Sequence, residues 1–501
     1  MGGQLTGNAS NYGWVVQKFG GTSVGKFPDK VSLSPSSHNL SLRLQPIAKD
    51  IVKANLSEHR VVVVCSARST GKKAEGTTSR LLGIYNKLKG IAAATNDEDV
   101  QNELMEEAKS LISDISSEHV LAVHNFIRNE DLQHALSQQI KDECQELTEY
   151  IVAAKRFNLE VNARSKDRVI SFGEKLSCRF MAILLQDQGV ASEYVDLSDV
   201  FHYDATARLD VSFYQEATAL LNKKILACED RVPVVTGFFG NVPGSLIDGD
   251  IGRGYTDLCA ALCAVGMRAD ELQVWKEVDG IFTADPSKGA HGTTSTVIHA
   301  NPPIPIRIKN VKNPTGVGTI VVPDPVLAAG HQIQRHAWSD PARLKKPKRP
   351  TAVTIKDKIS VINVHSNKRS ISHGFFAKVF SILDRHQVSV DLISTSEVHV
   401  SMAIHVGNSE PGQFDKARLE LEDCGDVSIL HDMAILSLVG AEMKNMVGIA
   451  GRMFSTLGEH QVNLEMISQG ASEINISCVI GARDATRAMN ILHTNLFTFL
   501  D

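Results

Sequence analysis

Short apolar runs alternate with longer helical patterns through about the first 325 residues of the chain. Val15-Val16, residues 61–65 and residues 232–235 are apolar, and each run leads into a loop that contains Gly, Ser or Thr. Residues 168–171 are predicted to form a further strand, with Phe172-Gly173-Glu174 on the turn into the next helix. Buried strands that end in such loops, each followed by a helix, are typical of an α/β sheet that binds ligands at its strand ends.

Two other segments have a different composition. Residues from about 95 to 155 are rich in Glu, Gln, Leu and Ala and almost free of Gly and Pro, which predicts a helical insertion. Residues 329–350 carry several prolines and the basic run KKPKR at 345–349. This pattern favours a solvated linker over a nuclear-localisation signal. Residues 13–328 are therefore predicted to be the α/β domain that precedes the linker.

Beyond the linker the chain repeats itself. Residues 380–388 (FSILDRHQV) parallel residues 454–462 (FSTLGEHQV) at an offset of 74, and residues 397–401 parallel 473–477 at an offset of 76. Each copy has the pattern of a helix, a strand, a turn and an alternating strand. The repeat predicts two similar small α+β domains, at 351–430 and 431–501, that pack sheet to sheet.

Composition and charge limit the classes of protein to which this chain can belong. A chain of 501 residues is too long for one core, and 43% hydrophobic with 22% charged residues is typical of soluble globular domains. A net charge of −5 gives no basic field for nucleic acid or membrane, and no apolar run approaches the roughly 20 residues of a membrane span. The eight cysteines form no zinc or disulfide pattern, which together with the absence of a secretory signal predicts a cytoplasmic protein.

A glycine-rich segment, KFGGTSVGK at residues 18–26, follows the first predicted strand. It satisfies the G-x-x-x-x-G-K pattern, but Phe27 stands where a Walker loop has the Ser or Thr that binds magnesium, so the Walker interpretation fails. The alternative is that Lys18 is the phosphate-binding cation, with Gly20 and Gly21 letting backbone N–H groups approach phosphate oxygens. A glycine-rich turn with two exposed lysines is the competing interpretation of this motif alone.

Two further segments carry candidate chemistry. DIGRGYTD at residues 250–257 sets Arg253 between glycines and Asp257 at the start of a helix, where either residue alone would ordinarily be an ion-pair partner or a helix cap. EVDGIFTADP at residues 277–286 is a strand and turn with acidic residues and an aromatic ring, which suits the edge of a nucleotide.

Together with the Phe-Gly-Glu segment, these motifs resemble the aspartate kinases of the amino-acid kinase family, and the fungal branch in particular. The resemblance covers about residues 15–27, 47–286 and 304–501, and the repeated domains resemble regulatory ACT domains. It implies an α/β fold, the αβα sandwich of carbamate-kinase type with a helical insertion, followed by two ferredoxin-like ACT domains.

The resemblance also implies a reaction, the MgATP-dependent phosphorylation of the L-aspartate side-chain carboxylate. That carboxylate has a pKa of about 3.9, so it is ionised at pH 7 and needs no general base. Magnesium would arrive with ATP and keep several waters, so no dedicated protein ligand cluster is expected. Lys18 would neutralise the moving phosphoryl group, held in place by Asp257. The implied substrate contacts are Thr78, Glu174 and Arg253, with Arg253 on a carboxylate and Glu174 on the amino group. The implied nucleotide contacts are Gly20, Gly21, Thr22, Ser23, Thr236, Gly237, Asp279, Phe282 and Asp285.

The first repeat resembles the family's effector pocket. The implied contacts are Gly374, Phe375, Phe376, Asp391, Thr395, Ser396 and Glu397. The second copy has Glu465 and Gln469-Gly470 instead, so it is expected to dimerise rather than to bind. The resemblance to the fungal branch implies feedback inhibition by threonine. A homo-oligomer built through the ACT domains is also expected. Two purely structural domains remain the alternative.

Two segments depart from the family pattern. Residues 31–45 are a low-complexity insertion, whose length alone costs little. After Lys288 only residues 289–303 stand where the family has a loop, a helix and a turn that ends in Ile-His-Pro. Loss of that segment would expose apolar surface, so a weakly active or inactive polypeptide is expected. The alternatives are therefore another amino-acid kinase, acting on glutamate, acetylglutamate or a nucleotide, and a catalytically impaired amino-acid sensor.

Overall fold

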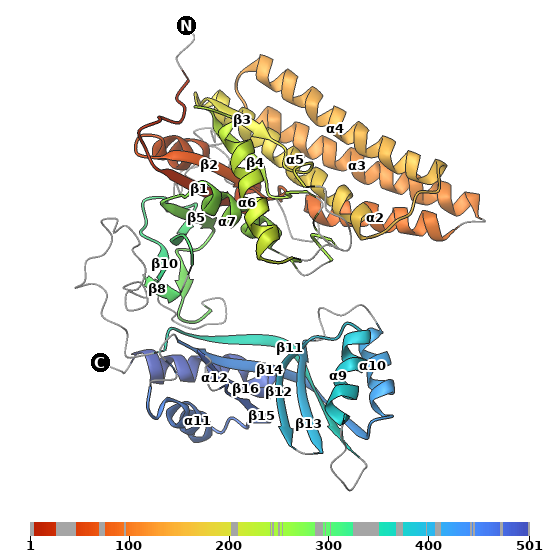
Figure 1. Ribbon diagram of the computed structural model, residues 1–501, viewed down its shortest axis with the longest axis vertical. Helices are drawn as coiled ribbons and strands as arrows, with labels where there is room; N and C mark the ends of the chain where they lie inside the picture. Colours follow the sequence, from red (N-terminus) through yellow and green to blue (C-terminus); the bar gives the residue numbers. More distant parts are fainter. Residues whose placement is uncertain are drawn as a thin grey trace, which may run out of the picture. The chain divides into compact units, whose positions relative to one another are not determined.

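The computed structural model divides into two compact units, which are described separately (Figure 1). The first unit comprises Met1–Gly280 and Asn301–Pro323, and the second comprises Ile281–Ala300 and Asp324–Asp501. Within these spans the structure describes residues 5–26, 47–69, 76–94, 97–201, 209–240, 242, 245–248, 251–252, 254–285, 294–295, 297–300, 302–323, 350–366, 374–396, 398–405, 412–440, 443, 446–470 and 474–498.

The first unit is built on a mainly parallel sheet. Its strands lie in the order β3 (Ser192–Val195), β4 (Val232–Thr236), β2 (Arg60–Cys65), β1 (Trp14–Phe19), β5 (Glu271–Lys276), β9 (Ile306–Asn310) and β10 (Thr319–Pro323). The neighbouring strands from β3 to β9 run parallel, and β10 pairs antiparallel with β9. The central strand β1 is buried along its whole length and ends directly before Gly20, so it includes the first two residues of the glycine-rich segment.

Helices cover both faces of this sheet, as Figure 1 shows. Alternation along β2 divides the core, since Val61 and Val63 pack on one face and Val62 and Val64 on the other. The first face is covered by η1 (Ile47–Lys53), α2 (Thr77–Ala93) and α5 (Ala163–Asp187), and the second by α6 (Val211–Leu226) and α7 (Tyr255–Gly266). The predicted αβα sandwich is confirmed.

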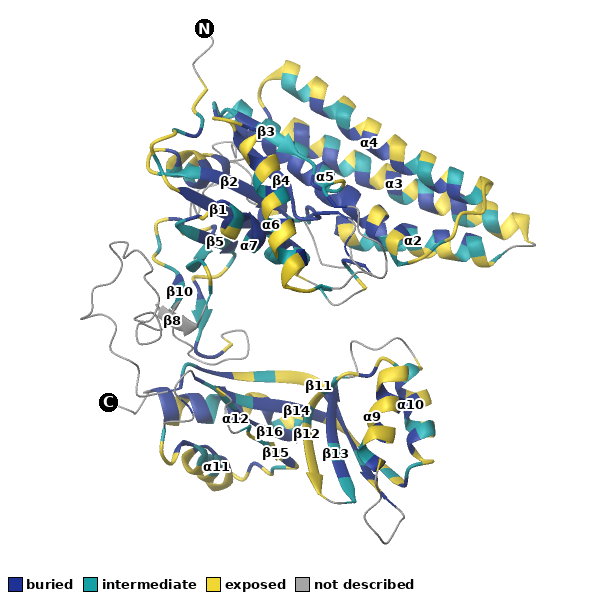
Figure 2. Ribbon diagram, viewed as in Figure 1, coloured by how far each residue is buried: buried dark blue, intermediate teal, exposed yellow. Residues whose placement is uncertain are grey.

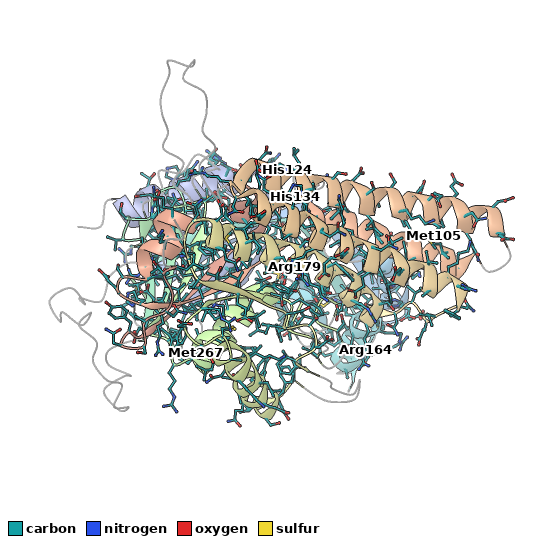
Figure 3. The ribbon with its side chains drawn as sticks, turned by 90° about the horizontal axis from the view of Figure 1, so that it is seen from above. Met105, His124, His134, Arg164, Arg179 and Met267 are labelled. Atoms are coloured by element: carbon teal, nitrogen blue, oxygen red, sulfur yellow. The ribbon has the colours of Figure 1, made fainter. Side chains whose placement is uncertain are left out.

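Two long antiparallel helices, α3 (Glu98–Phe126) and α4 (Glu130–Arg156), occupy the segment predicted to be a helical insertion. Asp97 and Asn129 cap them by accepting hydrogen bonds from backbone N–H groups of the first turn. Each helix carries a buried stripe and an exposed face (Figure 2). Figure 3 shows Arg179 of α5 beneath this pair, and its Nη2 lies 2.5 Å from Glu143 Oε1 of α4.

The strand predicted at residues 168–171 is wrong. These residues lie inside α5, a 25-residue helix that begins after Asn162 with a capping box to Ser165. The β-branched pair Val169-Ile170 suggested a strand, but a short apolar run does not distinguish a buried strand from a helix. Phe172-Gly173-Glu174 is accordingly not a strand-to-helix turn, and Glu174 projects from the middle of a buried helix.

The second unit contains one six-stranded sheet in the order β12 (Val390–Ser396), β13 (His399–His405), β11 (Ala352–His365), β14 (Asp426–Val439), β16 (Asn475–Gly481) and β15 (Met466–Ser468). Its helices are α9 (Phe375–Arg385), α10 (Gln413–Leu421), α11 (Ile449–Glu459) and α12 (Ala485–His493), with the short turns η6 (Ala482–Asp484) and η7 (Thr494–Thr498). Each repeat forms the helix, strand and strand that its pattern predicts. This unit also contains β6 (Ile281–Phe282), β7 (Thr294–Ser295) and β8 (Val297–Ala300).

The two repeats share their longest strands. The first part of β11 pairs with the second part of β14, and the remainder of β11 pairs with the beginning of β14. The register shifts near Lys358, and both Lys358 and Asp432 have positive φ angles, of 60° and 56°. The edge strands β12 and β15 contact each other, which a flat sheet of six strands does not allow. The expected sheet-to-sheet packing is therefore achieved by bending one continuous sheet around a small apolar core that includes Val361, Ile435 and Val479.

None of the helices in the described ranges combines the length and the apolar character that crossing a bilayer requires.

Burial of His119 in α3 predicts an acid-sensitive fold. Its side chain is 1% exposed, and burial lowers its pKa from 6.5 to about 4, with the charges of Arg68, Arg80 and Glu118 nearby. The unfolded chain binds a proton at this residue between pH 6.5 and pH 4 and the folded chain does not, so stability falls as the pH falls through that window. The full loss from this group is about 3 kcal/mol.

Urea unfolding measured at pH 7 and pH 5 checks this expectation. The variant His119→Gln is expected to lose less stability than the unmodified chain over that interval. His124→Gln, at an exposed position on the same helix, is the control and should leave the difference unchanged. An equal loss for all three proteins would contradict the assignment.

Candidate active site

The end of β1 and the beginning of α7 bring together two of the predicted catalytic residues. Lys18 is the penultimate residue of β1, is 4% exposed, and places Nζ 2.8 Å from Asp257 Oδ1. Helix α7 begins after Gly254, whose φ of +101° is readily adopted by glycine, and Asp257 lies in its first turn. The carboxylate of Asp257 is partly exposed, so this ion pair is buried at the lysine and open at the aspartate.

A second acidic side chain lies beside this pair. Glu174 of α5 is 1% exposed and accepts hydrogen bonds from the backbone N–H of Phe238 and from Thr256 Oγ1, the latter at 2.8 Å. Burial raises the pKa of Glu174 to about 7, against the opposing effects of hydrogen bonds from Thr256, Phe238 and Tyr255 and of the charge of Lys18. The charge of Lys18 acts on Glu174 and its ammonium is paired with Asp257, so the three side chains form one cluster.

Sequence analysis missed the partners that hold Glu174 in place. Thr256 and Tyr255 lie within the 250–257 motif, and Phe238 directly follows the predicted contacts Thr236 and Gly237. Burial, and then Glu174, raise the pKa of the Tyr255 hydroxyl well above its usual value. The position of these residues inside or beside the motifs was the one available signal that they belong to the site. No spacing rule connects them with Glu174 of α5, which lies 64 to 82 residues earlier in the chain.

The glycine-rich segment forms the short helix α1 (Gly21–Lys26) directly after β1. A Cβ added at Gly20 would meet nothing within 4 Å, so this position faces open space next to Lys18. Thr22 is half-buried, whereas Ser23 is fully buried and its hydroxyl donates to Glu277 Oε1 at 2.7 Å. The segment thus presents backbone at Gly20, while Ser23 fastens it to the end of β5.

The other predicted nucleotide contacts have different surroundings. Thr236 is buried, and its hydroxyl donates to the carbonyl oxygen of Phe238 at 2.8 Å and accepts from the N–H of Leu197 at 3.0 Å. Gly237 lies so close to Thr256 that an added Cβ would be 2.4 Å from its methyl carbon. Neither residue has a side chain free for a ligand, so any contact would be made by backbone.

Asp279 is exposed and accepts a hydrogen bond from Asn310 Nδ2 at 2.9 Å. Phe282, which is half-buried, and Asp285, which is exposed, belong to the second unit and are described only there. Thr78 is exposed in the first turn of α2. Arg253 lies outside the described residues, as do residues 31–45 and much of the segment from 286 to 303.

The predicted effector contacts lie at the beginning of α9 and along β12 of the first repeat. Gly374, with a φ of +86°, precedes α9, and the rings of Phe375 and Phe376 lie 5.2 Å apart between centroids. Asp391 on β12 is paired with Lys356, whose Nζ lies 2.5 Å from Oδ1. Thr395 and Ser396 are exposed further along β12, and Glu397 lies outside the described residues.

Within the described ranges, no three His, Cys, Asp or Glu side chains lie together as a metal site.

Comparison with known proteins gives consistent results. The sequence profile of the amino acid kinase family matches residues 13–299, and that of an ACT domain matches residues 436–496. The chain is 52% identical over 515 residues to "Aspartate kinase FUB3" of Gibberella moniliformis, covering 97% of this chain and 98% of that one. It is 47% identical over 520 residues to the aspartokinase of Schizosaccharomyces pombe, covering 98% and 94%.

Among solved structures, E. coli aspartokinase III in complex with aspartate and ADP superposes with a TM-score of 0.65 at 23% identity, over 96% of this chain and 99% of that one. At this level of identity the match establishes a common fold.

The two adjacent glycines of the segment offer a matched pair of substitutions. A Cβ at Gly21 would lie 2.1 Å from the carbonyl oxygen of Ala67, whereas one at Gly20 would contact nothing. Gly21→Ala is therefore expected to destabilise the fold by about 1–3 kcal/mol, as overpacking does, and Gly20→Ala by less than about 1 kcal/mol. Thermal unfolding checks this difference, and equal midpoints for the two variants would contradict it.

Proposed function

The chain belongs to the amino acid kinase family as an aspartate kinase of the fungal type, and on that premise we propose that the Lys18 cluster is its phosphoryl-transfer centre. The substrates are ATP and L-aspartate, and the product is 4-phospho-L-aspartate. The observation that carries this assignment is the buried ammonium of Lys18, held 2.8 Å from Asp257 beside the buried Glu174.

The proposed reaction involves no proton transfer. A side-chain oxygen of aspartate attacks the γ-phosphorus of ATP, the bond from that phosphorus to the β,γ-bridging oxygen breaks, and ADP leaves with the bonding electron pair. Catalysis of such a transfer consists mainly of positioning and of charge stabilisation. Magnesium bound with ATP neutralises phosphate charge. Lys18 supplies a fixed positive charge at the strand end, and Asp257 limits the directions in which its Nζ can point.

The remaining roles follow from the surroundings of each residue. Open space at Gly20 admits a phosphate to the backbone, with Gly21, Thr22 and Ser23 shaping the segment. Ionised Glu174 attracts the ammonium group of aspartate, and Arg253 and Thr78 are proposed to hold its carboxylate end. In the first unit, Thr236, Gly237 and Asp279 are the proposed nucleotide contacts.

The product is a mixed anhydride, an activated acyl group that a following step must consume before it hydrolyses. We place the reaction at the first step toward homoserine, threonine and methionine. Threonine is the proposed feedback inhibitor, acting at the first ACT repeat through Gly374, Phe375 and Asp391. The second ACT repeat is proposed to assemble a homo-oligomer.

Trapping the acyl phosphate with hydroxylamine tests the reaction directly. With ATP and L-aspartate, Lys18→Ala is expected to lower kcat by about 10² to 10³-fold, because the fixed charge at the transferred group is lost. Lys26→Ala, at the exposed lysine of the same motif, is the matched control and should retain activity. Equal losses in both variants would contradict the role of Lys18.

A panel of acceptors in the same assay separates the alternatives. Product from glutamate or acetylglutamate in preference to aspartate would indicate another amino-acid kinase. Absence of product with every acceptor, accompanied by calorimetric binding of threonine but not of ATP, would indicate an impaired sensor, as the short segment at 289–303 suggests.

The raised pKa of Glu174 predicts a pH dependence of aspartate binding. Because this pKa is about 7, the carboxylate protonates as the pH falls below 7 and its attraction for an ammonium group is lost. The KM for aspartate is therefore expected to rise by up to about tenfold per pH unit between pH 7 and pH 5. Glu174→Gln should have a high KM that is independent of pH, and the same slope in both proteins would exclude the assignment.

Effector binding is tested by threonine titration of the activity. Asp391→Asn is expected to raise the half-inhibitory concentration of threonine by at least about tenfold, since a charge-assisted contact to the ammonium group is lost. Glu465→Gln, in the second repeat, is the control and should leave inhibition unchanged. The reverse pattern would place the effector in the second repeat.

A further inference from the structure

The glycine-rich segment is held along its length by residues 67–69, which lie shortly after the end of β2. An added Cβ at Gly21 would lie 2.1 Å from the carbonyl oxygen of Ala67, and one at Gly25 would lie 2.1 Å from the carbonyl oxygen of Ser69. The N–H of Ser69 also donates to the carbonyl oxygen of Gly21 at 3.0 Å. Backbone therefore lies on backbone at both ends of α1, which only glycine permits at this separation. We call residues 67–69 the clamp.

Arg68, at the centre of the clamp, is a buried cation. Its side chain is 3% exposed, its Nη2 donates to the carbonyl oxygen of Gly25 at 3.3 Å, and its guanidinium lies 5.4 Å from the ring centroid of Phe180. Burial lowers the pKa of Arg68, and the charge of Glu118 acts in the opposite direction. A guanidinium in such a place requires a counter-charge, because an isolated buried cation is costly.

The counter-charge comes from the helical insertion. Glu118 of α3 places Oε1 4.0 Å from Arg68 Nη1, and its other oxygen, Oε2, lies 2.6 Å from Arg80 Nη1. Arg80 follows Thr78 by two residues in the first turn of α2. The carboxylate of Glu118 thus connects the clamp, which holds the glycine-rich segment, with the first turn of α2, which carries the proposed aspartate contact Thr78.

We propose that Glu118, through Arg68 and Arg80, fixes the spacing between the glycine-rich segment at Gly20–Lys26 and the first turn of α2, which carries Thr78. Within the function proposed above, on which this role rests, Glu118 and the two arginines are positioning residues that touch neither substrate. The helical insertion then has a direct part in the reaction, since it supplies the group that aligns the two substrates.

The chain contains a matched control for this role. Lys87 of α2 and Glu107 of α3 form a second ion pair between the same two helices. Glu107 is exposed, and the pair is remote in sequence from both the clamp and Thr78. If ion pairs between α2 and α3 only stabilised the fold, Glu118→Gln and Glu107→Gln would have the same effect on kcat and on amide exchange.

Steady-state kinetics and equilibrium binding give the first readout. Glu118→Gln is expected to lower kcat by about tenfold to a hundredfold, the size of effect that a misplacement of about 1 Å produces. Equilibrium affinity for ATP alone should change by less than about threefold, because each substrate still finds its own contacts. Glu107→Gln should retain the kcat of the unmodified chain, and an equal loss in both variants would overturn the proposal.

Hydrogen exchange gives a second readout that does not depend on turnover. The N–H groups of Val24 and Ser69 bond to the carbonyl oxygens of Gly20 and Gly21, so they report on α1 and the clamp. Their exchange is expected to accelerate at least about tenfold in Glu118→Gln and to stay unchanged in Glu107→Gln. Unchanged exchange in Glu118→Gln would overturn the proposal even for a chain without turnover.

A double variant guards against simple misfolding. Glu118→Gln leaves Arg68 as a buried cation without its counter-charge, whereas Arg68→Met combined with Glu118→Gln removes the buried cation together with its half-buried partner and often costs less stability. The double variant should fold, with faster exchange at Ser69 and reduced kcat. If acyl phosphate is absent in the unmodified chain, the proposed function fails, and the exchange data alone decide the role of Glu118.

Discussion

The ammonium of Lys18 is buried near the end of the central strand of a sheet, and the arrangement of the site follows from pairing that ammonium with a carboxylate. A lysine at 4% exposure needs a carboxylate, and α7 supplies Asp257 at its first turn, 2.8 Å away. That requirement fixes where α7 begins, and therefore where Thr256 stands. Thr256 in turn holds Glu174, so one ion pair sets the geometry of a second acidic group that comes from a different layer of the sandwich.

The same cluster contains two carboxylates in different surroundings, which is a common means of separating roles within a site. Asp257 is partly open to solvent and paired with a cation, whereas Glu174 is enclosed and its pKa is raised to about 7 by burial. Glu174 is therefore poised to respond to a neighbouring positive charge near neutral pH. A buried carboxyl that becomes ionised when an ammonium group arrives couples substrate binding to proton release.

Much of the fold could be predicted from the sequence, because the spacing of apolar residues and the positions of Gly and Pro identified most of its elements. The buried valines of β1, β2 and β4, the helical composition of the insertion and the repeat at an offset of 74 all correspond to elements of the structure. The error at residues 168–171 arose because a short β-branched run looks the same in a strand and in a buried helix. The bending of one sheet through Lys358 and Asp432 depends on positive φ angles at residues that carry no such signal. At the site, the resemblance implied the pairing of Lys18 with Asp257, and the two side chains form an ion pair of 2.8 Å. The contacts of Glu174 and Arg68 span 43 residues or more along the chain, so no local pattern reveals them.

The strands β11 and β14 each run through both halves of the regulatory unit without a break in the backbone. Two domains joined by side-chain contacts can slide past each other, but two halves that share their central strands cannot. The two halves are therefore connected by two continuous polypeptide backbones as well as by packed side chains. A displacement of either half therefore moves the backbone of strands that also belong to the other half.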